Sequence, residues 1–168
     1  VVGDVDVNYV EGKIKELFGG IKMPENPKPV VAEAVPDNSE PIVIIDKDKE
    51  QKTTMLTMMF KHNAVPKEAK STIDYLIGDY IKSIANDMLN ARLAEYAQKA
   101  ESPFVGAQVS DGHFLFAKTK EAFELSATPK DGKIEASLAA AYREALRAAE
   151  FGFTATEYSR AKANTLSA

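Results

Sequence analysis

The sequence predicts an α+β fold, a two-layer sandwich with helices packed on one face of a mostly antiparallel sheet of about five to six strands. Three observations support this prediction. Stretches with apolar residues at helical spacing are interspersed with short β-branched or aromatic stretches. After residue 103 the connections are too short to cross over a sheet, so the strands there must be antiparallel. A length of 168 residues and a 45% apolar share suit one globular domain, residues 1–168.

The first twenty residues combine a short strand signal with a helix signal. Residues 1–5 are rich in valine, which predicts a strand that runs into a turn. In residues 7–18 the apolar side chains recur at helical spacing. Asp6 can cap this helix, and Gly19-Gly20 can end it. We therefore expect a strand followed by an amphipathic helix.

Residues 20–41 form a proline-rich connector. Proline removes the amide donor that a helix or a central strand requires, so this segment is expected to be extended and to lie on the surface. A linker between two domains is the alternative. However, the roughly twenty residues before it are too few to bury a core of their own. We therefore favour a connector internal to a single domain.

Two strands and a long helix are expected next. Residues 42–45 are a continuous apolar run, which predicts a buried strand, and residues 53–60 alternate partly and predict a second one. From Pro66 a helical rhythm of apolar residues extends over more than four turns and ends before Pro103.

The segment after Pro103 predicts three strands, at residues 104–109, 113–117 and 123–127. Ser110-Asp111-Gly112 separates the first two, and an Asp-Gly pair is a hairpin signal. We therefore expect an antiparallel meander.

Two helices should close the chain. The first follows residues 129–132, with its apolar face formed by residues between Ile134 and Ala149. Thr154 and Glu157 have the spacing of a capping box, which places the start of the second helix at about residue 155. Phe153 before the cap can pack on Tyr158 as a hydrophobic staple.

Composition excludes several classes of function. The net charge is −4, and a mildly acidic chain has no electrostatic reason to bind nucleic acid. The chain has no cysteine, which excludes disulfides, thiolate zinc sites and thiol catalysis. Its apolar runs are too short to span a membrane.

Residues that could carry catalysis or bind a metal are few. The two histidines, His62 and His113, each follow a turn-like composition, and neither has a Glu or His three or four residues away on a common helix. We therefore interpret both as exposed turn residues. No Gly-x-Ser-x-Gly motif, serine–histidine pair or phosphate-binding glycine loop is present. The sequence thus predicts no catalytic, cofactor-binding or metal-binding residue in this chain.

Several strings resemble the pitrilysin/insulinase-type zinc peptidases, the inverzincins, and do so in the family's order. The resemblance is to the non-zinc domain and is greatest for the long single-chain bacterial members. It is carried by Val1–Asp6 with the helix ending at Gly19, by Met88–Leu93, by Ser102-Pro103-Phe104, and by Glu150–Lys162.

The resemblance implies a role beside a catalytic domain. Family members build a hollow clamshell from homologous domains, and one of these carries the zinc-binding H-x-x-E-H motif. This chain lacks that motif. In the opposite half of the clamshell the family has an Arg and a Tyr that hold substrate, and the aligned residues here are Gln98 and Val105. The resemblance therefore implies the second domain of the zinc-bearing half.

Three functional readings stay open. The first is a noncatalytic domain of a zinc metalloendopeptidase, with the zinc held elsewhere in the parent protein. The second is a domain of a zinc-free partner subunit in a two-chain processing enzyme, and the third is a self-contained binding module. Both ends of the sequence fall within expected secondary structure, so we expect a piece of a longer polypeptide, whose adjacent domains would be its partners and whose substrate would be a peptide. The resemblance to bacterial enzymes implies a periplasmic or cell-envelope location.

Overall fold

The computed structural model describes residues 2–167. Between Val31 and Ala32 the chain divides into two compact units, which are described separately here. The expectation of a single domain over residues 1–168 stays a prediction.

The first unit contains one helix, α1 (Val7–Phe18), as the sequence predicted. The carboxylate of Asp6 accepts a hydrogen bond of 2.9 Å from the amide of Tyr9 and so caps the helix. At the other end, the Gly19 amide donates to the carbonyl of Lys15. A Cβ atom on Gly19 would lie 2.4 Å from that carbonyl oxygen, so a larger residue would force the chain to move here.

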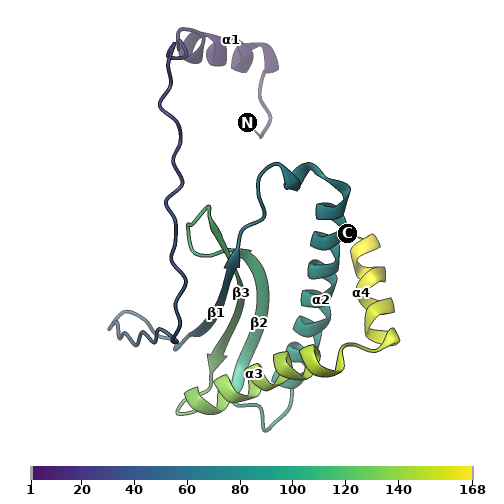
Figure 1. Ribbon diagram of the computed structural model, residues 1–168. Helices are drawn as coiled ribbons and strands as arrows, with labels where there is room; N and C mark the ends of the chain where they lie inside the picture. The colour runs from purple at the N-terminus through teal and green to yellow at the C-terminus, as the bar shows by residue number, and fades with distance from the viewer. Residues whose placement is uncertain (1, 168) are drawn as a thin grey trace. The chain divides into compact units, whose positions relative to one another are not determined.

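The second unit is built around a three-stranded antiparallel sheet (Figure 1). Its strands are β1 (Leu56–Asn63), β2 (Phe104–His113) and β3 (Lys120–Pro129), with β3 in the centre. Leu125 pairs with Met58 on one side and with Val109 on the other, so these three side chains share one face of the sheet.

The sheet is smaller than the sequence predicted. The α+β class fits, but residues 2–167 form three strands and not the expected five to six. Residues 2–5 are not a strand (residue 1 is outside the described residues), and residues 42–45 form no strand either, with all four side chains exposed. β-branched composition suggested strands at both places, but a strand needs a neighbouring strand to pair with, and neither segment has one.

The expected hairpin at Ser110-Asp111-Gly112 is also wrong. These residues continue β2, where Asp111 pairs with Phe123 and Gly112 pairs with Ala122. The reversal lies at residues 114–119, where Leu115 has a positive φ of 52°. Two long strands therefore replace the three short ones, because pairing with β3 continues through the Asp-Gly pair.

Four helical segments complete the second unit: η1 (Ala69–Ser71), α2 (Ile73–Ala97), α3 (Ile134–Phe151) and α4 (Ala155–Ser167). The long helix α2 begins after Thr72, whose hydroxyl accepts a hydrogen bond from the Tyr75 amide, seven residues later than Pro66 suggested. Along the described chain, no helix combines the length and the apolar character needed to cross a membrane.

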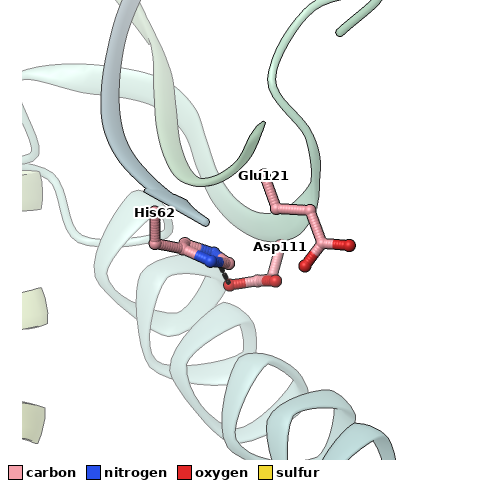
Figure 2. Close-up of side chains that lie close together, drawn as sticks. All are labelled: His62, Asp111 and Glu121. Carbon is pink, nitrogen blue, oxygen red and sulfur yellow. Dashed lines mark ion pairs between the residues drawn. The ribbon is translucent and has the colours of Figure 1, made fainter. Parts of the chain in front are cut away.

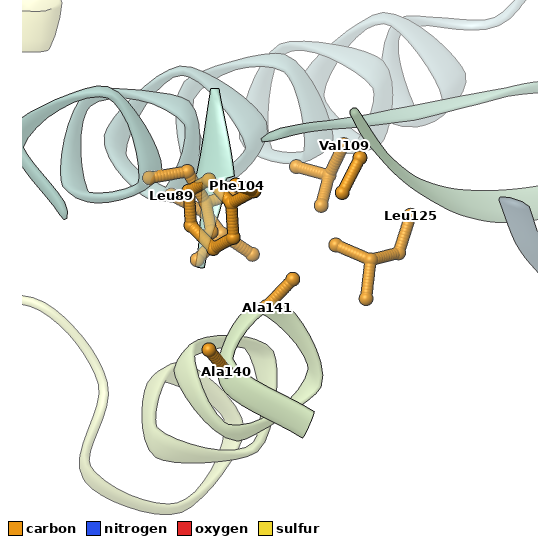
Figure 3. Close-up of a cluster of buried hydrophobic side chains, with 8 residues drawn as sticks. Leu89, Phe104, Val109, Leu125, Ala140 and Ala141 are labelled. Carbon is orange, nitrogen blue, oxygen red and sulfur yellow. The ribbon is translucent and has the colours of Figure 1, made fainter. Parts of the chain in front are cut away.

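The main hydrophobic core lies between the sheet and two helices (Figure 3). α2 contributes Leu89 and Leu93, whereas α3 contributes the small residues Ala140 and Ala141, which let that helix approach the sheet closely. The strands contribute Phe104, Val109, Leu125 and Ala127. Each fully buried large apolar side chain contributes roughly 1.5–3 kcal/mol to folding. Helices and sheet therefore hold each other through one shared apolar layer.

One polar side chain completes the packing of α2 against β2. The amide group of Asn90 donates to the carbonyl of Val109 at 3.0 Å, and its oxygen accepts from the Val109 amide at 2.7 Å. β2 is an edge strand, so its outward peptide groups have no strand partner. Asn90 therefore satisfies both the backbone N–H and the backbone C=O of Val109 at that edge.

Candidate functional site

The structure gathers three potential ligand side chains at one end of the sheet (Figure 2). His62 comes from β1, Asp111 from β2 and Glu121 from β3, and one ligand atom of each lies within 4.8 Å of those of the other two. His62 pairs directly with Glu121, and Asp111 lies on the neighbouring edge strand. Register in the sheet, and not closeness in sequence, brings them together.

The histidine of this cluster has defined partners for both ring nitrogens. Nδ1 lies 3.2 Å from the carbonyl oxygen of Asn63, and Nε2 lies 3.4 Å from Oδ2 of Asp111. His62 is 42% exposed and lies in strand β1, whereas its sequence context predicted an exposed turn residue. His113, the last residue of β2, is exposed and pairs with Glu121 in the register of the sheet, but it supplies no ligand atom to the cluster.

Two lysines accompany the carboxylates. Lys70 donates to Oε1 of Glu121 at 3.1 Å, and Lys82 donates to Oδ1 of Asp111 at 3.2 Å. Burial lowers the pKa of Lys82, but the hydrogen bond and the negative charge of Asp111 outweigh that effect, so the pKa is raised overall. The two carboxylates and two ammonium groups balance in charge.

No local pattern in the sequence marks Asp111 and Glu121 as site residues. One signal was present: side chains alternate along a strand, so Glu121 shares the core-facing side of β3 with Phe123 and Leu125. A carboxylate at a core-facing position requires a partner. The partner itself depends on the pairing of β1 with β3, two strands separated in sequence by α2 and β2.

A second polar arrangement joins α2 to the start of α4. Arg92 donates to both carboxylate oxygens of Glu157, at 2.5 and 2.9 Å, and to the carbonyl of Gly152 at 2.9 Å. Its guanidinium also lies 4.5 Å from the centre of the Phe153 ring. These contacts hold the α3–α4 connection against α2.

Glu157 also closes the predicted capping box. Its carboxylate accepts hydrogen bonds from the amide and hydroxyl of Thr154, and its own amide donates to that hydroxyl. The hydrogen bond from Arg92, aided by those from Thr154, outweighs the effect of burial and lowers the pKa of Glu157 to about 2. The carboxylate is therefore ionised at neutral pH and has a structural role.

A groove of about 480 Å³ runs between α2 and α4 beside this pair. Its lining is mixed: Arg92, Glu157 and Asn90 are already engaged in the structural contacts described above, and the rest includes Ser83, Asp87 and Asn164. No histidine lines it. The groove therefore offers a polar surface whose candidate proton acceptors are carboxylates and not a histidine.

Gln98 and Val105 are the positions at which the resemblance led us to expect the substrate-holding residues. Gln98 is the C-terminal cap residue of α2, and Val105 lies in β2 with its side chain exposed. Neither supplies a cation or a phenol.

Comparison with known proteins identifies relatives at the level of the family. A sequence model described as the peptidase M16 inactive domain matches residues 1–165. No curated protein matches the sequence significantly.

Solved structures share the fold at low sequence identity. The periplasmic protease PqqL from Escherichia coli is 20% identical, with a TM-score of 0.65 over 99% of this chain and 18% of PqqL. The first half of PqqL, solved separately, is 19% identical with the same TM-score, and this chain covers 34% of it. A predicted insulinase family protease from Yersinia pestis is 15% identical with a TM-score of 0.70, over 99% of this chain and 34% of that one. This chain therefore spans about a fifth to a third of the proteins that it resembles.

Proposed function

The chain belongs to the peptidase M16 inactive domain family, and from this premise we propose that it is a noncatalytic structural domain of a zinc metalloendopeptidase. In that role it completes the peptide-degrading chamber beside the zinc-bearing domain. Its partners are the adjacent domains of the same polypeptide, and the parent protein acts on peptides.

The observation that carries this proposal is that the polar side chains described above make structural contacts within the domain. Arg92 and Glu157 fasten a helix connection, and Asn90 satisfies the edge of β2. The two histidines do not form H-x-x-E-H, so these residues do not fit the family's catalytic zinc, and no step of hydrolysis is assigned to them. Side chains used in this way support a structural role for the domain and not a catalytic one.

Two further points support the proposed place of this domain in the parent and the proposed location of the parent. Gln98 and Val105 stand where the substrate-holding half of the family has an Arg and a Tyr, which favours the second domain of the zinc-bearing half. One structural relative is a periplasmic protease, which supports a periplasmic or cell-envelope location for the parent.

The proposal can be tested in the parent protein by removing the segment that corresponds to residues 1–168. We expect the shortened protein to keep the zinc ion of its H-x-x-E-H motif, while peptide hydrolysis falls at least about tenfold because the chamber is incomplete. Retained zinc shows that the zinc-bearing domain is still folded, so it separates loss of the chamber from general unfolding. Full hydrolysis by the shortened protein would contradict the proposal. A parent sequence without any H-x-x-E-H motif would instead favour the zinc-free partner subunit.

A further inference from the structure

We propose that His62, Asp111 and Glu121 form a structural binding site for a divalent transition-metal ion that joins the ends of all three strands. The site is separate from the parent's catalytic zinc and does not depend on the proposed function. Its three ligands are one imidazole and two carboxylates, a mixed nitrogen and oxygen set that suits Zn²⁺ and its neighbours in the first transition row.

The spacing of the ligand atoms fits such an ion. Zinc bonds to histidine nitrogen and carboxylate oxygen at about 2.0–2.2 Å, so two ligands of one tetrahedral zinc lie about 3.4 Å apart. Nε2 of His62 and Oδ2 of Asp111 are already 3.4 Å apart. A ligand oxygen of Glu121 already lies within 4.8 Å of the other two ligand atoms, so it needs to approach them by only part of that distance.

The hydrogen bonding of His62 is the second observation. The carbonyl of Asn63 can only accept, so in the neutral ring Nδ1 carries the proton and Nε2 has a lone pair. That lone pair lies 3.4 Å from a carboxylate oxygen of Asp111, and the two repel unless a positive charge lies between them. A histidine that binds a metal typically donates its other ring N–H to a backbone carbonyl in this way. A proton on Nε2 of His62 is the alternative to a metal ion as the positive charge between the two groups.

The lysines leave room for the ion. Lys70 contacts Oε1 of Glu121 and Lys82 contacts Oδ1 of Asp111, so each lysine engages one oxygen of its carboxylate. The side chains of Lys70 and Lys82 are 34% and 40% exposed, so both can turn toward water when a cation binds. Asp79 also lies near enough to Lys82 to support its charge. The lysines thus hold the carboxylates in place and compete only weakly with the metal.

The experiment is a titration of chelator-treated protein with Zn²⁺, followed by calorimetry, in the wild type and in His62→Gln. We expect the variant to bind one zinc ion fewer per chain, or to bind that ion at least about tenfold more weakly. Any zinc held elsewhere in the protein cancels in this difference. His113→Asn is the matched control: His113 pairs with Glu121 across the β2–β3 ladder but supplies no ligand atom to the cluster, so this variant should bind as the wild type does.

Two further measurements keep the result interpretable. His62 is 42% exposed, so His62→Gln should fold, and circular dichroism checks that it does. Lys82→Met removes a competing positive charge and should bind zinc several-fold more tightly than the wild type. Equal zinc stoichiometry and affinity in the wild type and in folded His62→Gln would overturn the proposal and leave a protonated His62 as the partner of Asp111.

Discussion

The two halves of helix α2 have similar sequence patterns and opposite surroundings. In residues 84–97 the apolar face is covered: Ile84, Met88, Leu89 and Leu93 are all buried. In residues 73–83 the apolar side chains recur at the same spacing, yet Ile73, Leu76, Ile77 and Ile81 are all more than half exposed. Apolar periodicity therefore identifies a helix and its apolar side, but it does not show whether anything covers that side.

The covered half differs from the exposed half also in its polar contacts. Asn90 and Arg92 lie within it and bind the edge of β2 and the start of α4. In the first half, the polar contact to the sheet runs through Lys82, a flexible side chain at 3.2 Å from Asp111. We therefore expect substitutions in the second half to cost far more stability than equivalent ones in the first half.

The largest effect is expected for Leu93→Ala. Leu93 is fully buried among residues of the sheet and α3, and truncation of a buried leucine leaves a cavity. The free energy of unfolding should fall by about 3–4 kcal/mol, measured by urea denaturation of the purified protein. A loss below about 1 kcal/mol would mean that this part of α2 is not packed as described.

Arg92→Met should come next, with a loss of about 2–3 kcal/mol. The substitution keeps an apolar stem but removes the hydrogen bonds to Glu157 and to the Gly152 carbonyl, and it leaves the carboxylate without its main partner. Arg160→Met is the matched control, because its contact with Glu95 is long, at 3.5 Å, and exposed. Equal losses in the two variants would rule out a special role for Arg92.

The pair of Arg92 and Glu157 also predicts a dependence on pH. The pKa of Glu157 is about 2 in the folded protein, against an ordinary value of 4.5, so its contribution is complete above pH 4.5. The contribution is lost as the pH falls from about 4.5 toward 2. At pH 7 the free energy of unfolding of the wild type should exceed that of Glu157→Gln by on the order of 2 kcal/mol. This difference should shrink as the pH falls from about 4.5 toward 2. A difference that does not vary with pH would contradict the assignment.

Asn90→Ala should cost about 1–2 kcal/mol. It removes two hydrogen bonds and leaves the partly buried backbone N–H and C=O of Val109 without a protein partner. The amide hydrogen of Val109 should then exchange with solvent faster, while the amide of Leu125 in the central strand should be less affected. Unchanged exchange at Val109 would show that Asn90 does not protect the edge of β2.

The smallest effect is expected for Leu76→Ala, which makes in the exposed half the same change that Leu93→Ala makes in the covered half. Leu76 is 63% exposed, and alanine and leucine are both good helix formers. The change in unfolding free energy should therefore stay within about 0.5 kcal/mol. A loss similar to that of Leu93→Ala would show that some part of the protein covers this half of α2.

Local signals predicted the starts of α1 and α4. The Asp6 cap marks the start of α1, and the Thr154–Glu157 capping box marks the start of α4, because each depends on residues a few positions apart. The number of strands was wrong because strand formation depends on distant partners. Residues 42–45 have strand composition without a neighbour, and the Asp111-Gly112 turn signal gives way to pairing with β3.

The three-residue cluster was beyond prediction for the same reason. His62 has no second ligand near it in sequence, so the sequence alone does not predict it as a metal ligand. Its companions Asp111 and Glu121 join it only through the register of three strands, which a local pattern does not determine. The resemblance to the family, by contrast, needed only the order of short motifs along the chain.

The most direct test of a noncatalytic role is a peptide hydrolysis assay on the purified chain with equimolar zinc. The chain should hydrolyse peptides no faster than buffer containing the same zinc, even if zinc binds at His62. Hydrolysis that disappears in His62→Gln would contradict this account, since it would make the cluster of His62, Asp111 and Glu121 a reaction centre.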